Sequence, residues 1–246
     1  MRIFALETST ERLSLALLKD GQMFERDIDA GQRHSDLALP LIRALFDEAR
    51  IAIADLDAIA FGQGPGSFTG VRIACGLAQG MAFGAGICTI PVETQMTLAE
   101  VSGKNRVLVA LDARMGEIYL AAYVRDEKIP AGWAHEVAPM LARPRALPAL
   151  QGDGWHLTGS AAGQPALLEA LQRAYAGQIA ETDDVRMPRA RAAALIAGRI
   201  LARTGEAAMV PPRDAAPLYL RDRVALTTAE REAAKRGPAA VAEVAA

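Results

Sequence analysis

The residues best suited to chemistry form one glycine-rich loop, Gly64-Pro65-Gly66-Ser67-Phe68-Thr69-Gly70. A loop of this kind that opens a helix can hold a phosphate group on its backbone amides. A Walker loop also needs Gly-Lys-Ser/Thr, and this loop contains no lysine. Ser67 does not fit the Gly-x-Ser-x-Gly elbow of a hydrolase, because Pro65 and Thr69 stand where glycines are needed. The loop therefore predicts neither a P-loop nor a serine nucleophile.

The histidines and cysteines do not form a metal or catalytic cluster in the sequence. His34, His135 and His156 are scattered without ligand spacing, and Cys75 and Cys88 lack CxxC spacing. A metallopeptidase needs clustered ligands and a carboxylate base. We therefore expect surface or hydrogen-bonded histidines, and buried free thiols.

A helix is predicted directly after the loop, with Ser67 or Thr69 as its N-cap and an end near Gly84. Small residues give this helix two ridges, one of Gly70, Ala74, Ala78 and Ala82 and the other of Gly76, Gly80 and Gly84. Each glycine costs a helix roughly 1 kcal/mol relative to alanine, so a ridge of glycines needs a compensating close contact. The helix either packs tightly against its own sheet or contacts a partner subunit, and the sequence leaves both open.

The elements that must position the loop begin with an antiparallel meander, predicted from strands at residues 3–6, 13–17 and 23–28. A helix capped by His34-Ser35-Asp36 follows, and its apolar stripe contains Leu37, Leu41 and Leu45. Strands at residues 58–62 and 87–91 flank the loop and its helix. Strands that alternate with helices after a meander predict a mixed α/β sheet.

The opening pattern returns at Arg106. Residues 2–7 and 107–112 are both apolar strands that end in an acid, Glu7 or Asp112, and each has a return strand at the same offset. A repeat at this scale predicts two lobes of one ancestral design, an N-terminal lobe at 1–104 and a C-terminal lobe at 105–226. Residues 227–246 are rich in alanine and clustered charges, and we expect them to be a disordered tail.

Composition sets broad limits on function. A chain of 246 residues can bury a full core, and a net charge of −2 gives no global attraction to nucleic acid. Arginines are concentrated after residue 185, so a local basic face and an ordinary solvated face both stay open. Glu7 interrupts the apolar amino terminus before a signal-peptide core can form, which predicts a cytoplasmic protein without a membrane span.

Two lobes with an acid at the tip of each first strand resemble the actin, Hsp70 and sugar-kinase (ASKHA) superfamily. The resemblance implies a ribonuclease H-like α/β fold with duplicated mixed sheets flanked by helices, and paired hairpins that hold nucleotide phosphates and a metal. Those hairpin turns are usually rich in glycine. Here the second turn has the bulky pair Arg114 and Met115, whereas the hydroxyls of Thr8, Ser9 and Thr10 suit a remnant nucleotide site.

The run Gly-Pro-Gly-Ser-Phe-Thr-Gly-Val-Arg-Ile, together with residues 3–10, 112–117 and 217–221, resembles the TsaB (YeaZ) family over residues 1–223. The resemblance implies a non-catalytic subunit that supports a TsaD-type partner in transferring threonylcarbamoyl to N6 of the tRNA adenosine 3′ of the anticodon (t6A). The catalytic paralogue carries a His-x-x-x-His metal motif, and its two ligand positions align with Thr94 and Leu98. The resemblance therefore implies no catalytic or metal-binding residue here, with ATP and a metal ion on the partner.

The same resemblance implies that the first two helices pack against the equivalent helices of the TsaD-type partner as a four-helix bundle. The interface residues expected on this basis are Leu37, Leu41, Leu45, Gly70, Val71, Ala74 and Ala78. A TsaE-type ATPase and tRNA are expected through the complex, with Arg189 and Arg191 as candidate residues for receiving the tRNA. A self-complementary patch implies a homodimer in isolation. The competing hypothesis, based on the acids Glu7 and Asp112, is an autonomous ASKHA-type ATPase or small-molecule kinase.

Overall fold

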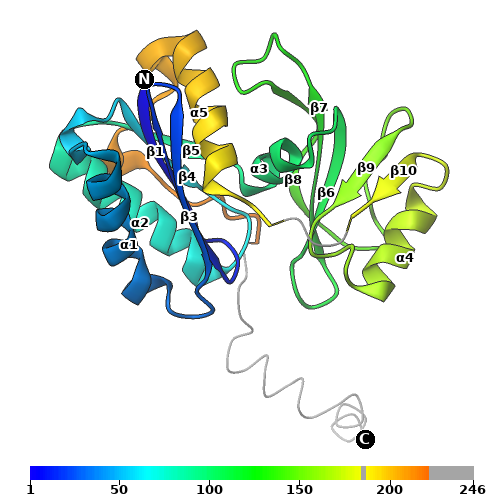
Figure 1. Cartoon of the computed structure of the whole chain (residues 1–246). Coiled ribbons are helices and arrows are strands. Elements are labelled where there is room, and N and C mark those ends of the chain that lie inside the picture. Colours follow the sequence, from blue (N-terminus) through cyan, green and yellow to red (C-terminus); the bar gives the residue numbers. More distant parts are fainter. Residues whose placement is uncertain (184–186, 222–246) are drawn as a thin grey trace, which may run out of the picture.

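The computed structural model describes residues 1–183 and 187–221 and has two lobes, each built on one five-stranded sheet (Figure 1). In both sheets the first strand along the chain is central, with the second and third on one side and the fourth and fifth on the other. The second lobe thus repeats the first, which confirms the predicted α/β fold with duplicated mixed sheets. The predicted tail at 227–246 lies outside the described residues.

The first sheet begins with the predicted antiparallel meander, which is confirmed. β1 pairs antiparallel with β2 and parallel with β4, so Phe4 lies between Leu17 and Ile59. The central strands β1 and β4 are buried along almost their whole length because helices cover both faces of the sheet. The strand order is β3-β2-β1-β4-β5, and the strands are β1 (Arg2–Glu7), β2 (Arg12–Lys19), β3 (Gln22–Asp29), β4 (Ala58–Gly62) and β5 (Thr89–Val92).

The second sheet has the order β10-β9-β6-β7-β8. Its central strand β6 pairs antiparallel with β7 and parallel with β9, as β1 does with β2 and β4. The strands are β6 (Arg106–Asp112), β7 (Ile118–Arg125), β8 (Trp133–Ala142), β9 (Trp155–Thr158) and β10 (Ile179–Thr182). The repeat therefore extends from the sequence pattern to the hydrogen-bonding pattern.

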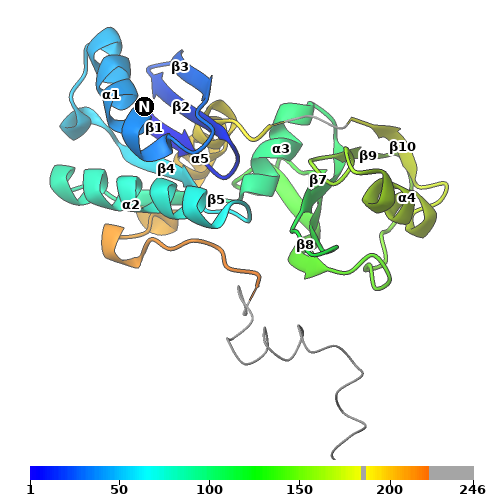
Figure 2. The ribbon, with the colours of Figure 1, turned by 90° about the horizontal axis from the view of Figure 1, so that it is seen from below.

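Two helices, α1 (His34–Ala49) and α2 (Phe68–Ala85), cover the outer face of the first sheet (Figures 1 and 2). The prediction that His34-Ser35-Asp36 caps α1 is wrong, because the N-cap position is Arg33 and no side chain caps this helix. α2 has the predicted cap, since the Ser67 hydroxyl accepts a hydrogen bond from the Gly70 amide at 3.3 Å. The buried stripe of α1 is Ala38, Ile42, Leu45, Phe46 and Ala49, together with His34.

Helices α3 (Thr94–Ser102) and α5 (Ala190–Thr204) lie between the two sheets and pack against each other. α3 contacts the second sheet although it precedes β6, and α5 contacts the first sheet although it follows β10. One continuous core, which includes Ile3, Leu98, Val109 and Ala193, joins the lobes. The packing units therefore differ from continuous chain ranges such as 1–104 and 105–226. The remaining helix, α4 (Pro165–Ala174), covers the outer face of the second sheet.

The Glu100 carboxylate of α3 ties this layer together. It accepts hydrogen bonds from Arg199 of α5 at 2.7 Å, from Trp133 of β8 at 2.7 Å and from Arg125 of β7 at 3.0 Å. Burial alone would raise the pKa of Glu100, but the hydrogen bonds and charges of these partners hold it below its usual value. The network fixes α3 and α5 against β7 and β8.

After α5 the chain returns to the first lobe and crosses toward the second. Residues 215–221, called the strap below, run along α2 (Figure 2). Leu218 donates its amide to the Gln63 carbonyl at 2.7 Å, while Arg221 donates to the Ala113 carbonyl at 2.9 Å and pairs with Glu117 at 2.7 Å. The strap thus links both lobes. The short 3-10 helices are η1 (Ile53–Asp55), η2 (Gly205–Ala208) and η3 (Pro212–Asp214).

Two glycines of α2 should respond to alanine in opposite directions. A Cβ at Gly70 would lie 1.9 Å from the Thr8 carbonyl oxygen, so we expect Gly70→Ala to lower the free energy of unfolding by roughly 2–3 kcal/mol. A Cβ at Gly76 meets nothing within 4 Å, and Gly76→Ala should raise that free energy by up to about 1 kcal/mol. Urea unfolding of both variants measures the difference. Equal effects of the two changes would contradict this packing of α2.

Candidate functional site

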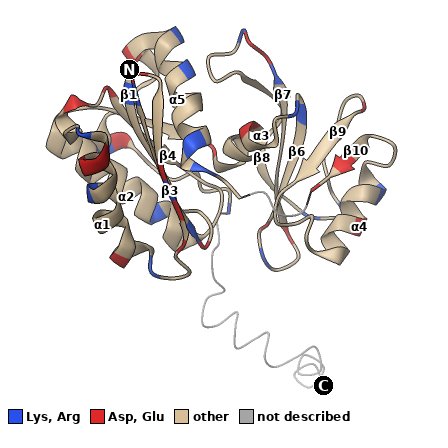
Figure 3. Ribbon diagram, in the orientation of Figure 1, with Lys and Arg blue, Asp and Glu red and all other residues tan. Residues whose placement is uncertain are grey.

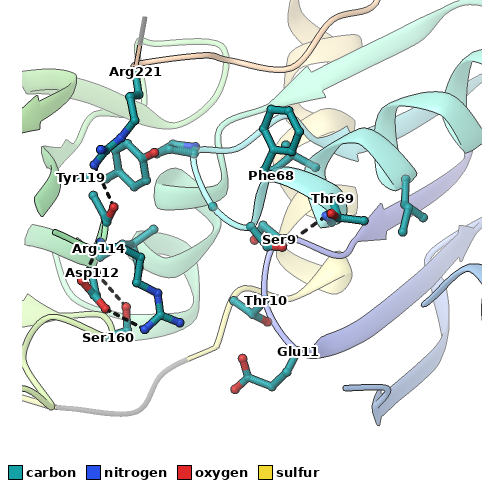
Figure 4. A pocket seen from close by; sticks show the side chains of 18 of the residues that line it. Ser9, Thr10, Glu11, Phe68, Thr69, Asp112, Arg114, Tyr119, Ser160 and Arg221 are labelled. Carbon is teal, nitrogen blue, oxygen red and sulfur yellow. Dashed lines mark hydrogen bonds and ion pairs between the residues drawn. The ribbon is translucent and has the colours of Figure 1, made fainter. Parts of the chain in front are cut away.

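A cleft of about 1010 Å³ lies between the lobes. One wall comes from the turn after β1 and the loop that begins α2, and the facing wall comes from the turn after β6 (Figure 4). The strap contributes Leu218, Tyr219, Leu220 and Arg221 to the lining. This is the place where the ASKHA resemblance implies a nucleotide, so its residues decide what chemistry it can perform.

The turn after β1 presses directly on the start of α2. The Thr8 hydroxyl donates to the Gly70 carbonyl at 2.7 Å, and the Ser67 amide donates to the Ser9 carbonyl at 2.7 Å. Position 66 requires glycine for the same reason as position 70, because a Cβ on Gly66 would lie only 2.6 Å from the Ser9 Cβ. The glycines of the loop therefore make room for the turn. Thr8 and Ser9 are buried by this contact, whereas Thr10 is half-buried at the cleft.

Glu7 is buried beneath the cleft, with 1% of its surface exposed. Its two carboxylate oxygens accept hydrogen bonds from the Ser9 amide at 2.7 Å and from the Thr94 hydroxyl at 2.9 Å. Burial raises the pKa of the Glu7 carboxyl, and the hydrogen bonds from Ser9 and Thr94 lower it only in part. The carboxyl group fills the space that Gly62 leaves open, because a Cβ on Gly62 would overlap it.

The two positions that align with metal ligands have structural roles here. Thr94 accepts a hydrogen bond from the Gly64 amide at 3.2 Å while it donates to Glu7. Leu98 is fully buried in the core between the sheets. A buried hydroxyl and an aliphatic side chain do not fit a metal ion that needs imidazole. Among residues 1–183 and 187–221, no three His, Cys, Asp or Glu side chains could hold a metal together.

Asp112, the acid of the second hairpin, is held by its own neighbours. It accepts hydrogen bonds from the Arg114 amide at 2.8 Å and from the Gln164 side chain at 2.7 Å. Arg114 and Met115 both have positive φ angles. The Arg114 side chain is 86% exposed and Met115 is 77% exposed. Figure 4 shows Arg114 and Asp112 on the wall opposite Ser9 and Phe68. The second hairpin thus presents the large side chains of Arg114 and Met115 to the cleft, and its Arg114 amide is occupied by Asp112.

The three histidines are apart in space and hydrogen-bonded, as predicted. His34 contacts the Arg12 carbonyl at 3.1 Å, His135 contacts Glu93 at 2.9 Å, and His156 contacts Asp183 at 2.8 Å. The hydrogen bond to Glu93 raises the pKa of His135. Each imidazole serves a local contact.

Most of the expected interface residues lie inside the first lobe. Gly70, Val71, Ala74, Ala78 and Leu45 are buried, whereas Leu37 and Leu41 are half-buried. Residues buried in this way cannot contact another subunit unless the lobe opens. The exposed positions of the same helices include the second small ridge, Gly76, Gly80 and Gly84. Phe83 of α2 exposes 81% of its surface, and Leu39 of α1 exposes 58%.

The arginines expected to receive tRNA are paired within the chain. Arg189 forms an ion pair with Asp27, and Arg191 pairs with Glu25 at 2.6 Å, both on β3. Positive and negative residues are spread over both lobes in the view of Figure 3. Sequence reasoning missed a different cluster, in which Arg72 lies over the Phe68 ring and donates to the Tyr219 hydroxyl at 2.7 Å. Arg72 and Tyr219 are 147 positions apart in the sequence, so no local pattern signals this contact.

Comparison with known proteins places these features in one family. The family described as "TsaD: tRNA N6-adenosine threonylcarbamoyltransferase" matches residues 28–227. The tRNA threonylcarbamoyladenosine biosynthesis protein TsaB of Escherichia coli is 36% identical over 233 residues, which are 92% of this chain and 96% of that protein. TsaB of Haemophilus influenzae is 35% identical over 71% of this chain and 85% of its own length.

Solved structures agree with the sequence relatives. YeaZ from Pseudomonas aeruginosa superposes with a TM-score of 0.76 at 33% identity, covering 89% of this chain and 99% of that chain. A second Pseudomonas aeruginosa structure, described as similar to the peptidase YeaZ, gives a TM-score of 0.80 at 32% identity with the same coverage. In the part of the chain that the structure describes, none of the helices is long and apolar enough to span a membrane.

Replacing Glu7 by glutamine should change how stability depends on pH. The raised pKa means that ionising Glu7 destabilises the folded state as the pH rises above about 4.3, its value in an unfolded chain. We expect Glu7→Gln, which cannot ionise, to gain free energy of unfolding relative to the wild type as the pH rises above about 4.3, with no relative gain at lower pH. Urea unfolding at several pH values measures this trend.

Asp20→Asn provides a control of opposite sign for this measurement. The hydrogen bond from the amino-terminal ammonium group is the main cause that lowers the pKa of Asp20. Asp20→Asn removes this carboxylate, so the variant should have a lower free energy of unfolding than the wild type as the pH rises. The difference between the two proteins should vanish in acid. A pH-independent difference between Glu7→Gln and the wild type would contradict the role assigned to the buried carboxyl.

Proposed function

The chain belongs to the TsaB (YeaZ) family, and from this premise we propose that it is a non-catalytic subunit in tRNA threonylcarbamoyladenosine biosynthesis. It binds a TsaD-type partner and supports that partner in transferring threonylcarbamoyl to N6 of the adenosine 3′ of the tRNA anticodon. ATP and the metal ion of the reaction belong to the partner. The observation that carries the proposal is the exposed glycine ridge of α2.

The glycines of this ridge have no explanation inside the chain. A Cβ at Gly76, Gly80 or Gly84 would meet nothing within 4 Å, so the fold does not require small residues there. Glycine in a helix costs roughly 1 kcal/mol relative to alanine, and three glycines on one ridge need a compensating contact. Small residues on a helix surface let a second helix approach closely. This favours a partner surface over the alternative of a helix packed tightly against its own sheet, which uses the other ridge.

Exposed apolar side chains lie near the glycine ridge and provide apolar surface that a partner can bury. Phe83 follows Gly80 by one helical turn, and Leu39 lies on the neighbouring helix α1. Leu37 and Leu41 are half-buried beside it. An apolar patch on adjacent helices is typical of an interface. Helices of a related fold can dock on this surface, and a second copy of the chain can use it as an isologous homodimer when the partner is absent.

The cleft supports the non-catalytic part of the proposal. Glu7 has a raised pKa and is buried, Asp112 is bonded to Arg114 and Gln164, and the aligned metal positions Thr94 and Leu98 stabilise the fold. General acid–base or metal chemistry needs such groups within reach of a substrate. The two acids on which the competing ATPase or kinase hypothesis depends, Glu7 and Asp112, are therefore both held in local hydrogen bonds. Of the three residues of the remnant nucleotide site, Ser9 and Thr10 line the cleft, whereas the Thr8 hydroxyl is bound to the Gly70 carbonyl.

The wider assembly follows from the same premise. A TsaE-type ATPase joins the pair, and tRNA binds to the complex rather than to a strongly basic face of this chain, whose net charge is −2. Because the substrate of the complex is tRNA, we assign the protein to the cytoplasm.

A bulky substitution on the ridge should separate partner binding from folding. We expect Gly80→Leu to weaken co-purification with the TsaD-type partner at least tenfold, because the new side chain holds the two helices apart, while its melting temperature stays at or above that of the wild type. Ala174→Leu, at an exposed position of α4, is the matched control and should assemble normally. Full assembly and tRNA modification with Gly80→Leu would show that this surface is not the interface.

Nucleotide titration tests the non-catalytic assignment independently. Isothermal titration of the isolated chain with Mg-ATP should give negligible heat, and no phosphate should be released above the rate of a protein-free blank. The physical reason is that the Ser9 and Arg114 amides of the two hairpin turns are bound by the chain's own carboxylates, Glu7 and Asp112, instead of being available to phosphate. Tight binding with turnover would instead support the autonomous ATPase or kinase.

A further inference from the structure

One edge of the cleft carries aromatic rings and a guanidinium group in a preformed arrangement. The Arg72 guanidinium carbon lies 3.7 Å from the centre of the Phe68 ring and 5.6 Å from the centre of the Tyr219 ring. The two ring centres are 6.4 Å apart with an interplanar angle of 37°. Phe68 and Tyr219 both line the cleft, and Figure 4 shows Phe68 standing on its wall. These three side chains are called the rim cluster below.

The rim cluster is exposed although its rings are apolar. Phe68 exposes 43% and Tyr219 exposes 51% of its surface. Met115, on the facing wall of the same cleft, is also among the exposed large hydrophobic side chains of the described residues. Apolar side chains that gather at one cleft indicate a binding site more strongly than single exposed residues do.

The charge of Arg72 is not neutralised by the chain. Among the described residues, no carboxylate lies within ion-pair distance of its guanidinium group, whose hydrogen-bond partner is the Tyr219 hydroxyl at 2.7 Å. By contrast, Arg189, Arg191 and Arg221 all pair with carboxylates. An unpaired arginine beside exposed rings suits a ligand that has both a flat π-face and a negative charge.

The strap holds this arrangement before any ligand arrives. Leu218 is fixed by its hydrogen bond to Gln63, and Arg221 is fixed by Glu117 and the Ala113 carbonyl, so Tyr219 is positioned from both sides. Phe68 is the first residue of α2, and Arg72 lies one turn later on the same side. A site built on fixed elements loses little entropy when it binds.

We propose that the rim cluster is a stacking site for an unpaired base of the tRNA substrate, with Arg72 placed to contact a phosphate of the same strand. This inference rests on the proposed function, which makes RNA the substrate of the complex. Single-stranded RNA loops are recognised by stacking of splayed bases on aromatic rings and guanidinium planes. The cleft of about 1010 Å³ has room for such a base and its sugar.

Photochemical crosslinking to the assembled complex tests the contact directly. The chain and a TsaD-type partner are combined with an anticodon stem–loop RNA that carries 5-iodouridine at one loop position at a time, since this base couples to rings on which it stacks. Crosslinked peptides are identified by mass spectrometry. We expect a crosslink to Phe68 or Tyr219. Crosslinks confined to other residues of the complex would overturn the proposal.

Substitutions in the same complex measure the contribution to affinity. Phe68→Ala combined with Tyr219→Ala should weaken RNA binding about tenfold or more. Arg72→Gln should reduce the dependence of affinity on salt by about one phosphate contact. Tyr219→Phe keeps the ring and should retain most of the stacking affinity, and Ile129→Ala, an exposed apolar residue outside the cleft, should change nothing. Unchanged RNA binding by the double variant would contradict the proposal.

Two further arms identify the failing step. Size-exclusion chromatography shows whether the wild-type chain and its partner assemble. If no complex forms, the result counts against the proposed function. If a complex forms but its RNA affinity does not change when the rim cluster is substituted, the result counts only against the stacking site. If the double variant assembles poorly, the cluster is a protein contact and the inference is wrong. Competition by AMP at the RNA-binding concentration would mean that the site takes a free nucleotide instead of an RNA loop.

Discussion

The contact between the turn after β1 and the first turn of α2 is the constraint on which the rest of the structure depends. Gly66 and Gly70 let the turn approach to van der Waals distance, and Thr8 and Ser67 lock it with hydrogen bonds. The contact sets the rotation of α2 about its axis, which decides that one small ridge faces the sheet and the other faces solvent. The turn also draws Glu7 away from the cleft, because Ser9 holds its carboxylate from below.

The exchange of α3 and α5 between the lobes adds a second constraint. Each helix packs on the sheet of the other half of the chain, and Glu100 binds side chains from α5, β7 and β8. The two lobes therefore share one core, and the strap closes a further connection through Arg221. Hinged lobes are useful to an enzyme that closes on a nucleotide. A chain with shared core and strap suits a subunit that presents fixed surfaces.

Much of the fold could be predicted from sequence because its signals are local. Apolar runs ending in Glu7 and Asp112 revealed the duplicated strands, and Ser67 marked the start of α2. The outward ridge could not be predicted, because both ridges are small and only the turn after β1 distinguishes them. The stripe assigned to α1 was correct at Leu45, which is fully buried, but Leu37 and Leu41 are only half-buried, and Ala38 and Ile42 beside them take the buried positions. The rim cluster depends on a chain return that no local pattern encodes.

The two proposed surfaces adjoin each other on one helix. Phe68 begins α2 and Phe83 lies in its last turn, so at 1.5 Å per residue they are separated by about 22 Å along the axis, whereas Arg72 and Gly76 are only about 6 Å apart. The face of α2 that contains Ala74 and Ala78 packs on the first sheet. A partner helix centred on Gly80 and Gly84 therefore lies toward the end of α2 that is remote from Phe68. Rigid attachment of both surfaces to α2 would hold the RNA loop at a fixed distance from the subunit that performs the chemistry.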